Sequence, residues 1–321
     1  MGSFDERDTI FSRMELTDGS QRYNAYYAAH PERKSADDKA RALRKPHPDD
    51  PLRRSLVDST FKLLEDLRPL ARGPALSADK LSIGPEEGTD FLRNLAASYG
   101  AVLFGTTQLG EECFYSTRGR GLEYGQPVSV PGNFGIVFAV PMDAAEIAAA
   151  PEPRAAAEVV NAYTKIAMIG LVVARCIRGW GWEAACTMDG RADVVLPLAA
   201  RCTGLGSLGR SGLLLTEAYG PCIRLGAVLT NLELAPTPAK PCTAARLCVN
   251  CSRCAQACPA AAIDKSESRS GQFRPVDDNA CFAAWQDFGT DCGLCLSSCP
   301  LSRIAHIVHI QEVKKRDDNT Y

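Results

Sequence analysis

Eight cysteines in the last quarter of the chain have the spacing that binds iron–sulfur clusters. The first group reads Cys248-x₂-Cys251-x₂-Cys254-x₃-Cys258-Pro259; the second is Cys281, Cys292, Cys295 and Cys299, again followed by proline. Three thiolates at three-residue spacing can surround one face of a [4Fe-4S] cluster, while the fourth cysteine of the run reaches a different cluster. The pattern predicts that cluster one is bound by Cys248, Cys251, Cys254 and Cys299, and cluster two by Cys258, Cys281, Cys292 and Cys295.

Zinc sites and disulfide bonds are the other common uses of clustered cysteines. Zinc is held by sets of four ligands, which fit poorly with a third closely spaced thiolate and with the two Cys-Pro endings. Nine of the 14 cysteines lie between Cys242 and Cys299, and the first 112 residues contain none. A secreted protein would distribute disulfide partners along the chain. We therefore expect a reduced, cytoplasmic protein with two [4Fe-4S] clusters.

The second cysteine group departs from the bacterial ferredoxin pattern. Ten residues separate Cys281 from Cys292, where that pattern has two. This loop, with Trp285 and Phe288, is expected to cover the second cluster. The remaining cysteines are expected to be small buried apolar residues, with Cys242 near enough in sequence to replace a ligand; they are Cys113, Cys176, Cys186, Cys202, Cys222 and Cys242.

A glycine-rich segment before the cysteines is a candidate for cofactor binding. Residues 204–209 match the G-x-G-x-x-G pattern. A dinucleotide-binding fold requires a helix directly afterwards, but 213–216 is apolar and strand-like, which disfavours that interpretation. A glycine-rich turn still lets a bulky cofactor approach the backbone closely. The candidate contacts are Gly204, Gly206, Ser207, Gly209, Arg210 and Gly212.

Composition excludes several classes of protein. The 321 residues are 45% hydrophobic and 23% charged with a net charge of −2, which suits about two globular domains and gives no basic excess for binding nucleic acid or an acidic membrane. The N-terminus has neither an apolar core nor a twin-arginine pair. The most apolar run, 166–174, stops at Arg175, well short of the ~18 residues of a membrane span.

The elements that must position these residues follow from periodicity. Apolar residues at helical spacing predict helices over 52–71, 89–99 and 154–177. Short apolar runs predict strands over 101–105, 135–140, 182–186, 194–198, 213–216 and 223–229. We expect an N-terminal arm at 1–51, an α/β (α+β) body at 52–235, a ferredoxin-like module at 236–310 and a polar tail at 311–321.

With these motifs the sequence resembles the reductive dehalogenases, cobalamin-dependent enzymes with two [4Fe-4S] clusters. The resemblance includes Tyr26-Tyr27 and His30-Pro31-Glu32 with Asp37-Asp38 in the arm, the Cys176–Trp182 segment, residues 204–234 and the cysteine module. Residues 204–234 followed by such a module are also similar to epoxyqueuosine reductase, a related cobalamin enzyme.

The resemblance implies a nitroreductase-like body that holds base-off cobalamin beside cluster two, contacted by the glycine-rich turn. The family's proton donor is a tyrosine after a buried strand and loop, and Tyr115 occupies that place. The implied basic partner on the later helix is Arg178, with Arg175 as the second choice. Glu111, four residues before Tyr115, is the next candidate donor if the tyrosine is not used.

The resemblance implies that an external ferredoxin, flavodoxin or reductase supplies electrons, which pass through both clusters to cobalamin and remove halide from a small organohalide. A homodimer is possible. Three alternatives remain: an epoxyqueuosine-reductase-like enzyme acting on tRNA, an electron-transfer protein that keeps only the clusters, and a cobalamin carrier. The near-neutral charge disfavours tRNA, and a carrier has no need of clusters.

Overall fold

The computed structural model describes residues 4–42, 50–238, 242–266 and 275–302. The predicted tail at 311–321, the end of the predicted cluster module and the middle of the linker at 239–241 lie outside these residues. Within them, helices and strands alternate along the body, so the mixed α/β class is confirmed. The predicted domain boundaries stay predictions.

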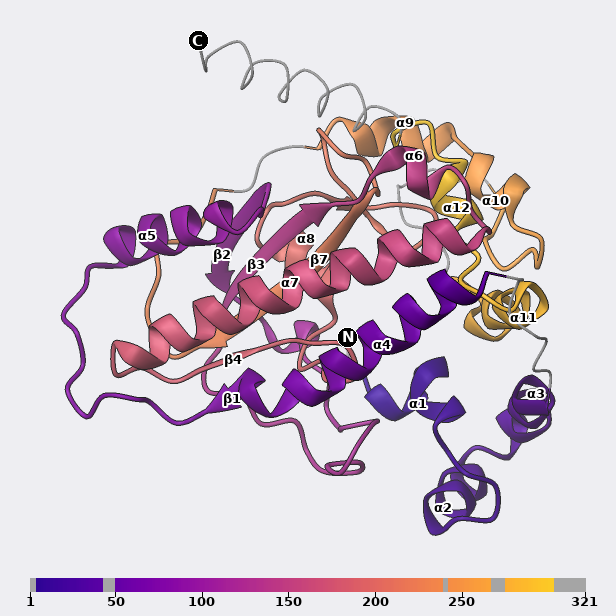
Figure 1. The fold of residues 1–321 in the computed structure, drawn as a ribbon, viewed down its shortest axis with the longest axis horizontal. Helices are drawn as coiled ribbons and strands as arrows, with labels where there is room; N and C mark the ends of the chain where they lie inside the picture. The colour runs from indigo at the N-terminus through magenta and orange to yellow at the C-terminus, as the bar shows by residue number, and fades with distance from the viewer. Residues whose placement is uncertain (1–3, 43–49, 239–241, 267–274, 303–321) are drawn as a thin grey trace.

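A five-stranded antiparallel sheet forms the centre of the molecule (Figure 1). Its strand order is β1 (Arg72–Gly73), β4 (Ala184–Cys186), β7 (Ile223–Thr230), β3 (Phe134–Pro141) and β2 (Leu103–Gln108). The long pair β3 and β7 is in a register that places Phe138 opposite Gly226. A Cβ atom at position 226 would collide with the Phe138 ring, so glycine lets that ring lie across the neighbouring strand.

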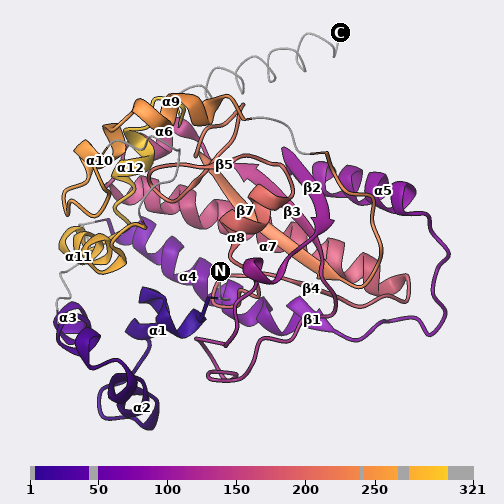
Figure 2. The same cartoon turned by 180° about the vertical axis from the view of Figure 1, so that it is seen from behind.

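Two helices cover opposite faces of this sheet. Ile166 of α7 (Pro153–Gly179) lies over Gly226, whereas Thr203, directly after α8 (Leu196–Cys202), lies over Gly105 of β2. Gly105 pairs with Val137, the neighbour of Phe138, and successive strand residues point to opposite faces. The long helix α4 (Pro51–Leu67) packs on the outside of α7, and α5 (Pro85–Ser98) packs beside β2. Figure 2 shows the sheet from the α8 side.

Helix α7 is long and apolar enough to span a membrane by length and composition alone. Its buried residues, such as Ile166, Ile169, Val173 and Ile177, recur at helical spacing. They pack on the sheet, and α4 contacts another side of the helix. This is the environment of a core helix, and the predicted helix over 154–177 is confirmed.

The N-terminal arm is more helical than its composition suggested. It forms α1 (Ile10–Met14), α2 (Gln21–Ala29) and α3 (Pro31–Ala42), and both α1 and α3 pack on α11 (Asp278–Phe288) of the cysteine module. Figure 1 shows the arm beside α11 at one end of the molecule. The arm and the module are therefore neighbours in space although they lie at opposite ends of the chain.

Two predictions about local structure are wrong. The expected strand at 194–198 is mostly the first turn of α8, where Pro197 suits a helix start; only Val194 makes a β-bridge, with Phe114. The segment between Cys281 and Cys292, expected to be a loop, is mostly α11. The strands expected at 101–105, 135–140, 182–186, 213–216 and 223–229 and the helices at 52–71 and 89–99 are confirmed with shifted ends.

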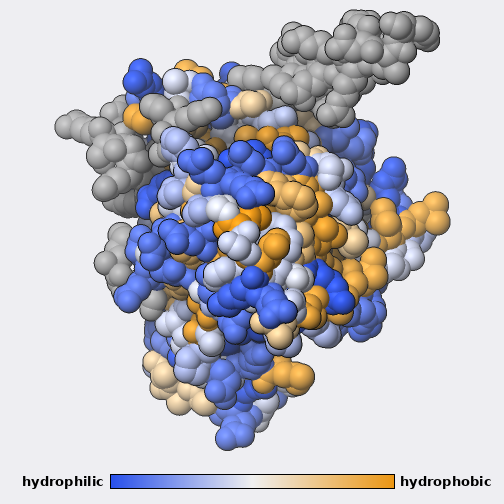
Figure 3. Space-filling view, turned by 90° about the vertical axis from the view of Figure 1, so that its left-hand side faces the viewer, coloured by the Kyte–Doolittle hydropathy of each residue, from blue (hydrophilic) through white to orange (hydrophobic). Residues whose placement is uncertain are grey.

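The remaining elements are short. They are η1 (Glu6–Asp8), η2 (Arg68–Ala71), η3 (Glu111–Cys113), α6 (Ala144–Ile147), β5 (Ser207–Leu208), β6 (Leu214–Leu215), α9 (Ala244–Asn250), α10 (Arg253–Ala257) and α12 (Leu294–Ser297). The surface at the far end of the molecule, near α5 and the end of α7, mixes apolar and polar side chains (Figure 3). Phe91 and Tyr99 contribute half-exposed rings to α5 and its C-cap.

Candidate active site and cluster-binding cavities

Four cysteines surround a cavity that we call the middle cavity. It has a volume of about 240 Å³ and is bounded by Cys258, Cys281, Cys292 and Cys295. These are the four residues that the ferredoxin pattern assigns to cluster two. Trp285 of α11 also lines this cavity, so α11 covers it in the way expected of the loop, although Phe288 is not among its lining residues.

A second set of cysteines surrounds a smaller space that we call the outer cavity. Its volume is about 30 Å³, and its sulfur atoms come from Cys248, Cys251, Cys254, Cys299 and Cys295. The first four are those assigned to cluster one. Cys295 lines both cavities, as does Ser211, so the two spaces adjoin each other. Leu247, which is 63% exposed, places the outer cavity close to the surface.

The cysteine thiols lie in surroundings that disfavour uncompensated negative charge. Burial and the neighbouring thiols raise the pKa of Cys254 and of Cys281 to about 11, and that of Cys295 to about 12. Backbone amides partly offset this cost. The Arg210 N–H donates to Cys248 Sγ, and the Ala262 N–H donates to Cys258 Sγ, both at 3.3 Å. A cationic metal centre would stabilise such a set of thiolates.

The glycine-rich segment is a short hairpin made by β5 and β6. Ser207 pairs with Leu215, and the Gly209 N–H donates to the Leu213 carbonyl at 2.8 Å. A Cβ atom at Gly206 would lie 2.2 Å from the Leu215 carbonyl oxygen, so this glycine is required for close approach of two backbones. The sequence pattern predicts that these glycines leave room for a cofactor. At Gly206 and Gly209 the room is instead filled by β6.

The predicted role of Arg210, at the tip of this hairpin, also needs correction. Its buried guanidinium donates to the carbonyls of Val249, Cys251, Asp264 and Ser266 at 2.6–3.1 Å. The side chain therefore fastens the body to the cysteine module and is not directed at a cofactor in the body. The hairpin contributes to the cavities through other residues: Ser211 lines the middle and outer cavities, and Leu213 lines the middle cavity.

A third space, which we call the sheet cavity, lies against β7. Its volume is about 260 Å³, and most of its walls are apolar. They include Ile166, Met188, Leu196, Leu214 and Leu225. Apolar walls with a few polar groups are typical of small-molecule and cofactor sites.

Two arginines and one carboxylate, that of Asp189, line the sheet cavity. Both Arg120 and Arg224 line it, and the Nε–H of each is buried without a hydrogen-bond partner among the described residues. The Arg120 Nε lies 3.8 Å from Glu6 Oε1, an ion-pair contact that is too long for a hydrogen bond. The Arg224 guanidinium lies 4.5 Å from the centre of the Tyr163 ring. The cavity thus offers donors to a ligand with oxygen acceptors.

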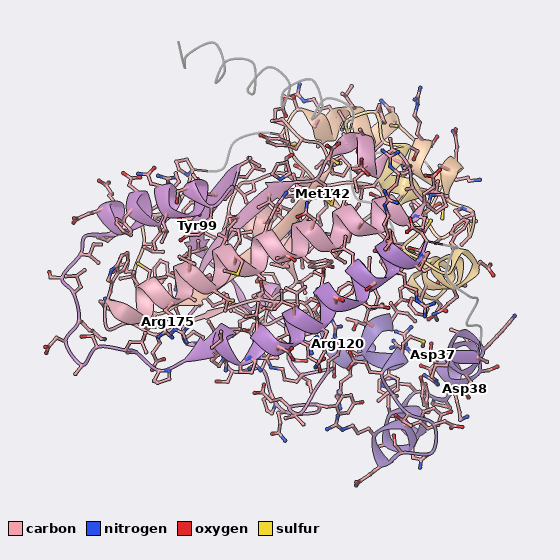
Figure 4. The ribbon with its side chains drawn as sticks, viewed as in Figure 1. Asp37, Asp38, Tyr99, Arg120, Met142 and Arg175 are labelled. Atoms are coloured by element: carbon pink, nitrogen blue, oxygen red, sulfur yellow. The ribbon has the colours of Figure 1, made fainter. Side chains whose placement is uncertain are left out.

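The sheet cavity and the middle cavity share a wall. Tyr163, Leu213 and Arg224 line both. The three cavities therefore form a continuous series, in which the outer cavity adjoins the middle one through Cys295 and Ser211, and the middle one adjoins the sheet cavity. Arg224 belongs to β7, and its Nη2 lies 3.8 Å from the Sδ of Met142, the residue directly after β3. Figure 4 labels Met142.

Tyr115 lies in a segment that is fixed by backbone pairing. It makes a β-bridge with Phe4, and its N–H donates to the Asp193 carbonyl at 3.1 Å. Burial, followed by the nearby Glu6 carboxylate, raises the pKa of its phenol to about 12, and Arg120 partly opposes this rise. Arg120 is thus the cation that acts on Tyr115. Arg120 lines the sheet cavity, whereas Tyr115 is not among the residues that line it.

The predicted partnership between Tyr115 and Arg178 is wrong. The Arg178 guanidinium is buried at the other end of α7, where its Nη2 donates to the Leu70 carbonyl at 3.1 Å and it packs on Gly73. Arg175, the second choice, also lies near that end and is well separated from Arg120 in Figure 4. The prediction relied on the position of both arginines near the end of α7. This helix runs along the sheet, and its end lies away from Arg120 (Figure 4). Glu111 is exposed in η3.

Sequence reasoning missed Arg120, Tyr163 and Arg224. One signal was available for Arg224, which is the single charged residue in the otherwise apolar strand 223–229. A charge in a buried strand is uncommon unless it is paired or has a function. Neither Arg120, in an irregular segment, nor Tyr163, at a half-buried helix position, had a comparable signal.

Comparison with known proteins supports the prediction of a cluster-binding module at the end of the chain. Residues 247–303 match the family described as 4Fe-4S dicluster domain. A tetrachloroethene reductive dehalogenase from Desulfitobacterium hafniense is 28% identical over 273 residues, which cover 68% of this chain and 49% of the relative. Epoxyqueuosine reductases match over shorter stretches. The chain spans about half the length, or less, of the dehalogenases that it matches.

Solved structures share the fold. The catabolic reductive dehalogenase NpRdhA in complex with 3-bromo-4-hydroxybenzoic acid superposes with a TM-score of 0.75 and 17% identity, covering 97% of this chain and 44% of that one. A reductive dehalogenase associated with B12-dependent dehalogenation gives a TM-score of 0.65 and 19% identity, covering 78% of this chain and 39% of that one. The chain therefore combines a 4Fe-4S dicluster domain with a body that shares its fold with reductive dehalogenases, the proteins to which its sequence is also similar.

Proposed function

We propose that this protein is a reductive dehalogenase that uses two [4Fe-4S] clusters and base-off cobalamin. The observation that carries the proposal is the series of three adjoining cavities. The outer and middle cavities each have four cysteines in the predicted set, and the sheet cavity shares Tyr163, Leu213 and Arg224 with the middle one. Such an arrangement would suit a cofactor site next to an electron relay.

The residues of the sheet cavity suit a corrin. Apolar side chains such as Leu225 and Met188 would pack on the ring, and the Nε–H groups of Arg120 and Arg224, which lack a hydrogen-bond partner among the described residues, would donate to its amide oxygens. When bound, cobalamin would supply the reduced cobalt that removes halide. The body would then be nitroreductase-like, as the resemblance implies. Its contacts would come from the sheet cavity, with the glycine-rich hairpin contributing Leu213 and Leu214.

The chain's own groups would position the substrate and its proton. Apolar walls would exclude water around an organohalide. Tyr115 would donate the proton that replaces halogen, and Arg120 would stabilise the resulting phenolate. Even with Arg120 nearby, the pKa of this phenol is about 12, which makes it a weaker acid than free tyrosine; without the arginine the phenol would be weaker still. Tyr163, which lines the cavity, is the alternative donor.

Electrons would enter at the outer cavity. Leu247 is exposed beside it and provides an apolar contact for a donor protein such as a ferredoxin, flavodoxin or reductase. None of the 14 cysteines is joined to another by a disulfide bond, which suits a reducing compartment such as the cytoplasm. The competing electron-transfer protein would have the same clusters and donor surface but would not need the sheet cavity.

The decisive experiment compares two tryptophan variants. Leu225→Trp fills the sheet cavity, whereas Leu122→Trp adds the same ring at a fully exposed position. Each protein is reconstituted anaerobically with iron, sulfide and cobalamin, and then iron, cobalt and released halide are measured with 3-bromo-4-hydroxybenzoate and with tetrachloroethene. Wild type and Leu122→Trp should hold about eight irons and one cobalamin per chain and release halide. Leu225→Trp should keep the iron and lose the cobalamin.

Three results would contradict parts of this proposal. Cobalamin retention by Leu225→Trp at the wild-type level would remove the sheet cavity from the assignment. A wild-type protein that loads eight irons but never retains cobalamin would favour the electron-transfer protein. A protein that binds cobalamin and reduces epoxyqueuosine in tRNA, but releases no halide from organohalides, would favour the epoxyqueuosine-reductase-like enzyme.

A further inference from the structure

A second group of potential metal ligands lies outside the three cavities. Cys113 Sγ and Cys202 Sγ are 3.5 Å apart, and a Glu112 carboxylate oxygen completes a set of three ligand atoms that all lie within 4.8 Å of one another. The cysteines are 89 positions apart in the sequence, so only the fold brings them together. The sequence alone predicts only that both are small buried apolar residues.

We propose that Glu112, Cys113 and Cys202 form a binding site for a thiophilic divalent cation, of the type that zinc occupies. Tetrahedral zinc with Zn–S bonds of ~2.3 Å requires a separation of about 3.8 Å between two sulfurs, which is close to the observed value. Two thiolates and one carboxylate are a suitable donor set for zinc, with water as the fourth ligand. Cys113 is fully buried and Glu112 is exposed, which leaves an entry path from solvent.

Both cysteines are held in place before any ion binds. The Cys113 N–H donates to the Gly110 carbonyl at 3.0 Å, and its carbonyl accepts from the Val195 N–H at 2.8 Å. Val195 is the N-cap of α8, and Cys202 is the last residue of the same helix. The Cys113 segment is thus attached to one end of α8 by a backbone hydrogen bond, and an ion would attach it to the other end.

The position of this site indicates which segments a bound cation would hold together. Cys113 is two residues before Tyr115, and Cys202 is two residues before the glycine-rich hairpin. A bound cation would therefore fix the segment that carries Tyr115 relative to the hairpin that contacts the cysteine module. The site does not depend on the proposed dehalogenase function, and its test has a separate readout.

Zinc counting in cluster-loaded protein tests the proposal. Protein reconstituted with iron and sulfide is incubated with Zn²⁺, freed of weakly bound metal and analysed for zinc by mass spectrometry and by zinc-edge X-ray absorption. One zinc per chain is expected, with two sulfur neighbours at ~2.3 Å and lighter atoms completing the shell. Cys202→Ala should lose this zinc, whereas Cys176→Ala, a half-buried thiol on α7, should keep it.

A milder variant keeps the test valid if the cysteine variant folds poorly. Glu112→Gln is exposed and should leave the fold intact while it weakens zinc binding at least ~10-fold in competition with a chelator. Zinc that survives Cys202→Ala, or that has four sulfur neighbours, would belong to the cluster cysteines and overturn the proposal. Protein that binds no zinc would also overturn the proposal. This holds whether Cys113 and Cys202 are then found as a disulfide or as two free thiols that react with an alkylating reagent.

Discussion

The Arg13 side chain of the N-terminal arm donates to the side-chain oxygen of Asn279 in α11 at 2.5 Å, across 266 positions of sequence. The same guanidinium forms a buried ion pair with Asp37 at 2.9 Å, and Tyr27 donates to that carboxylate. Phe11 adds ring contacts with Phe282 and Trp285 of α11. The arm thus holds the helix that carries Cys281, a residue of the middle cavity.

Arg13→Met should release the arm and leave Asp37 as an uncompensated buried charge. Removal of one partner from a buried ion pair typically costs ~3–5 kcal/mol of the free energy of unfolding. Urea denaturation measures this loss, and iron analysis should show weaker retention at the middle cavity because α11 is no longer held. Arg54→Met, which removes an exposed ion pair with Asp58, should cost less than ~1 kcal/mol. Equal losses in the two variants would contradict the assignment.

Arg210→Met should separate the hairpin from the cysteine module. Its four carbonyl acceptors would lose their donors, at ~1–3 kcal/mol for each group left unsatisfied. We expect a lower urea midpoint and loss of iron from the cluster at the outer cavity, because Cys248, Val249 and Cys251 are the neighbours of this arginine. Any loss of cobalamin should follow the loss of iron and should not precede it. The exposed Arg246 provides the control, and Arg246→Met should keep all the iron.

Arg224→Met should lower the reduction potential of the cluster at the middle cavity. A positive charge ~10 Å away stabilises an added electron by about 1.7 kcal/mol at an effective dielectric constant of ~20, or ~70 mV. EPR-monitored redox titration measures this shift, and Arg224→Lys should restore most of it. The pKa of Asp291 is raised by burial, and the charge of Arg224 opposes this rise. In Arg224→Met, Asp291 would therefore be protonated more easily, which would offset part of the change in potential. An unchanged or higher potential would argue against this position for the charge.

Tyr115 should contribute to the decline of stability at alkaline pH. Its pKa is about 12 in the folded protein and about 10 when unfolded, so between these values the unfolded chain has lost a proton that the folded chain retains. The free energy of unfolding then falls as pH rises, by up to ~1.4 kcal/mol per pH unit from this group. Urea unfolding between pH 9 and 11.5 should be less pH-dependent in Tyr115→Phe. Tyr99→Phe, at the exposed end of α5, should behave like wild type (Figure 4).

Three variants, Tyr115→Phe, Arg120→Met and Tyr163→Phe, test proton delivery. General acid catalysis is typically worth ~10²–10⁴ in rate. Tyr115→Phe should lose halide release in that range with iron and cobalamin intact, and Arg120→Met should act through the same step, so that the double variant loses less than the sum of the two. If Tyr163→Phe alone shows the loss, the proton comes from the residue that lines both cavities.

Sequence alone was sufficient where the chemistry depends on local spacing. The C-x₂-C runs place thiolates on one short loop, so the dicluster domain could be predicted without knowledge of the rest of the fold. The same holds for α7 and for strands β3 and β7, because 3.6-residue or continuous apolar patterns reflect burial of one element at a time.

Tertiary structure alone decided which distant residues meet. It placed Arg120 close enough to act on the Tyr115 phenol, whereas Arg178, at the end of α7, lies against Leu70 and Gly73. It also determined that the glycines of 204–212 form a backbone hairpin and that Cys113 lies next to Cys202. Loops have no periodic pattern from which side-chain direction can be read, so these contacts depend on packing of the whole chain.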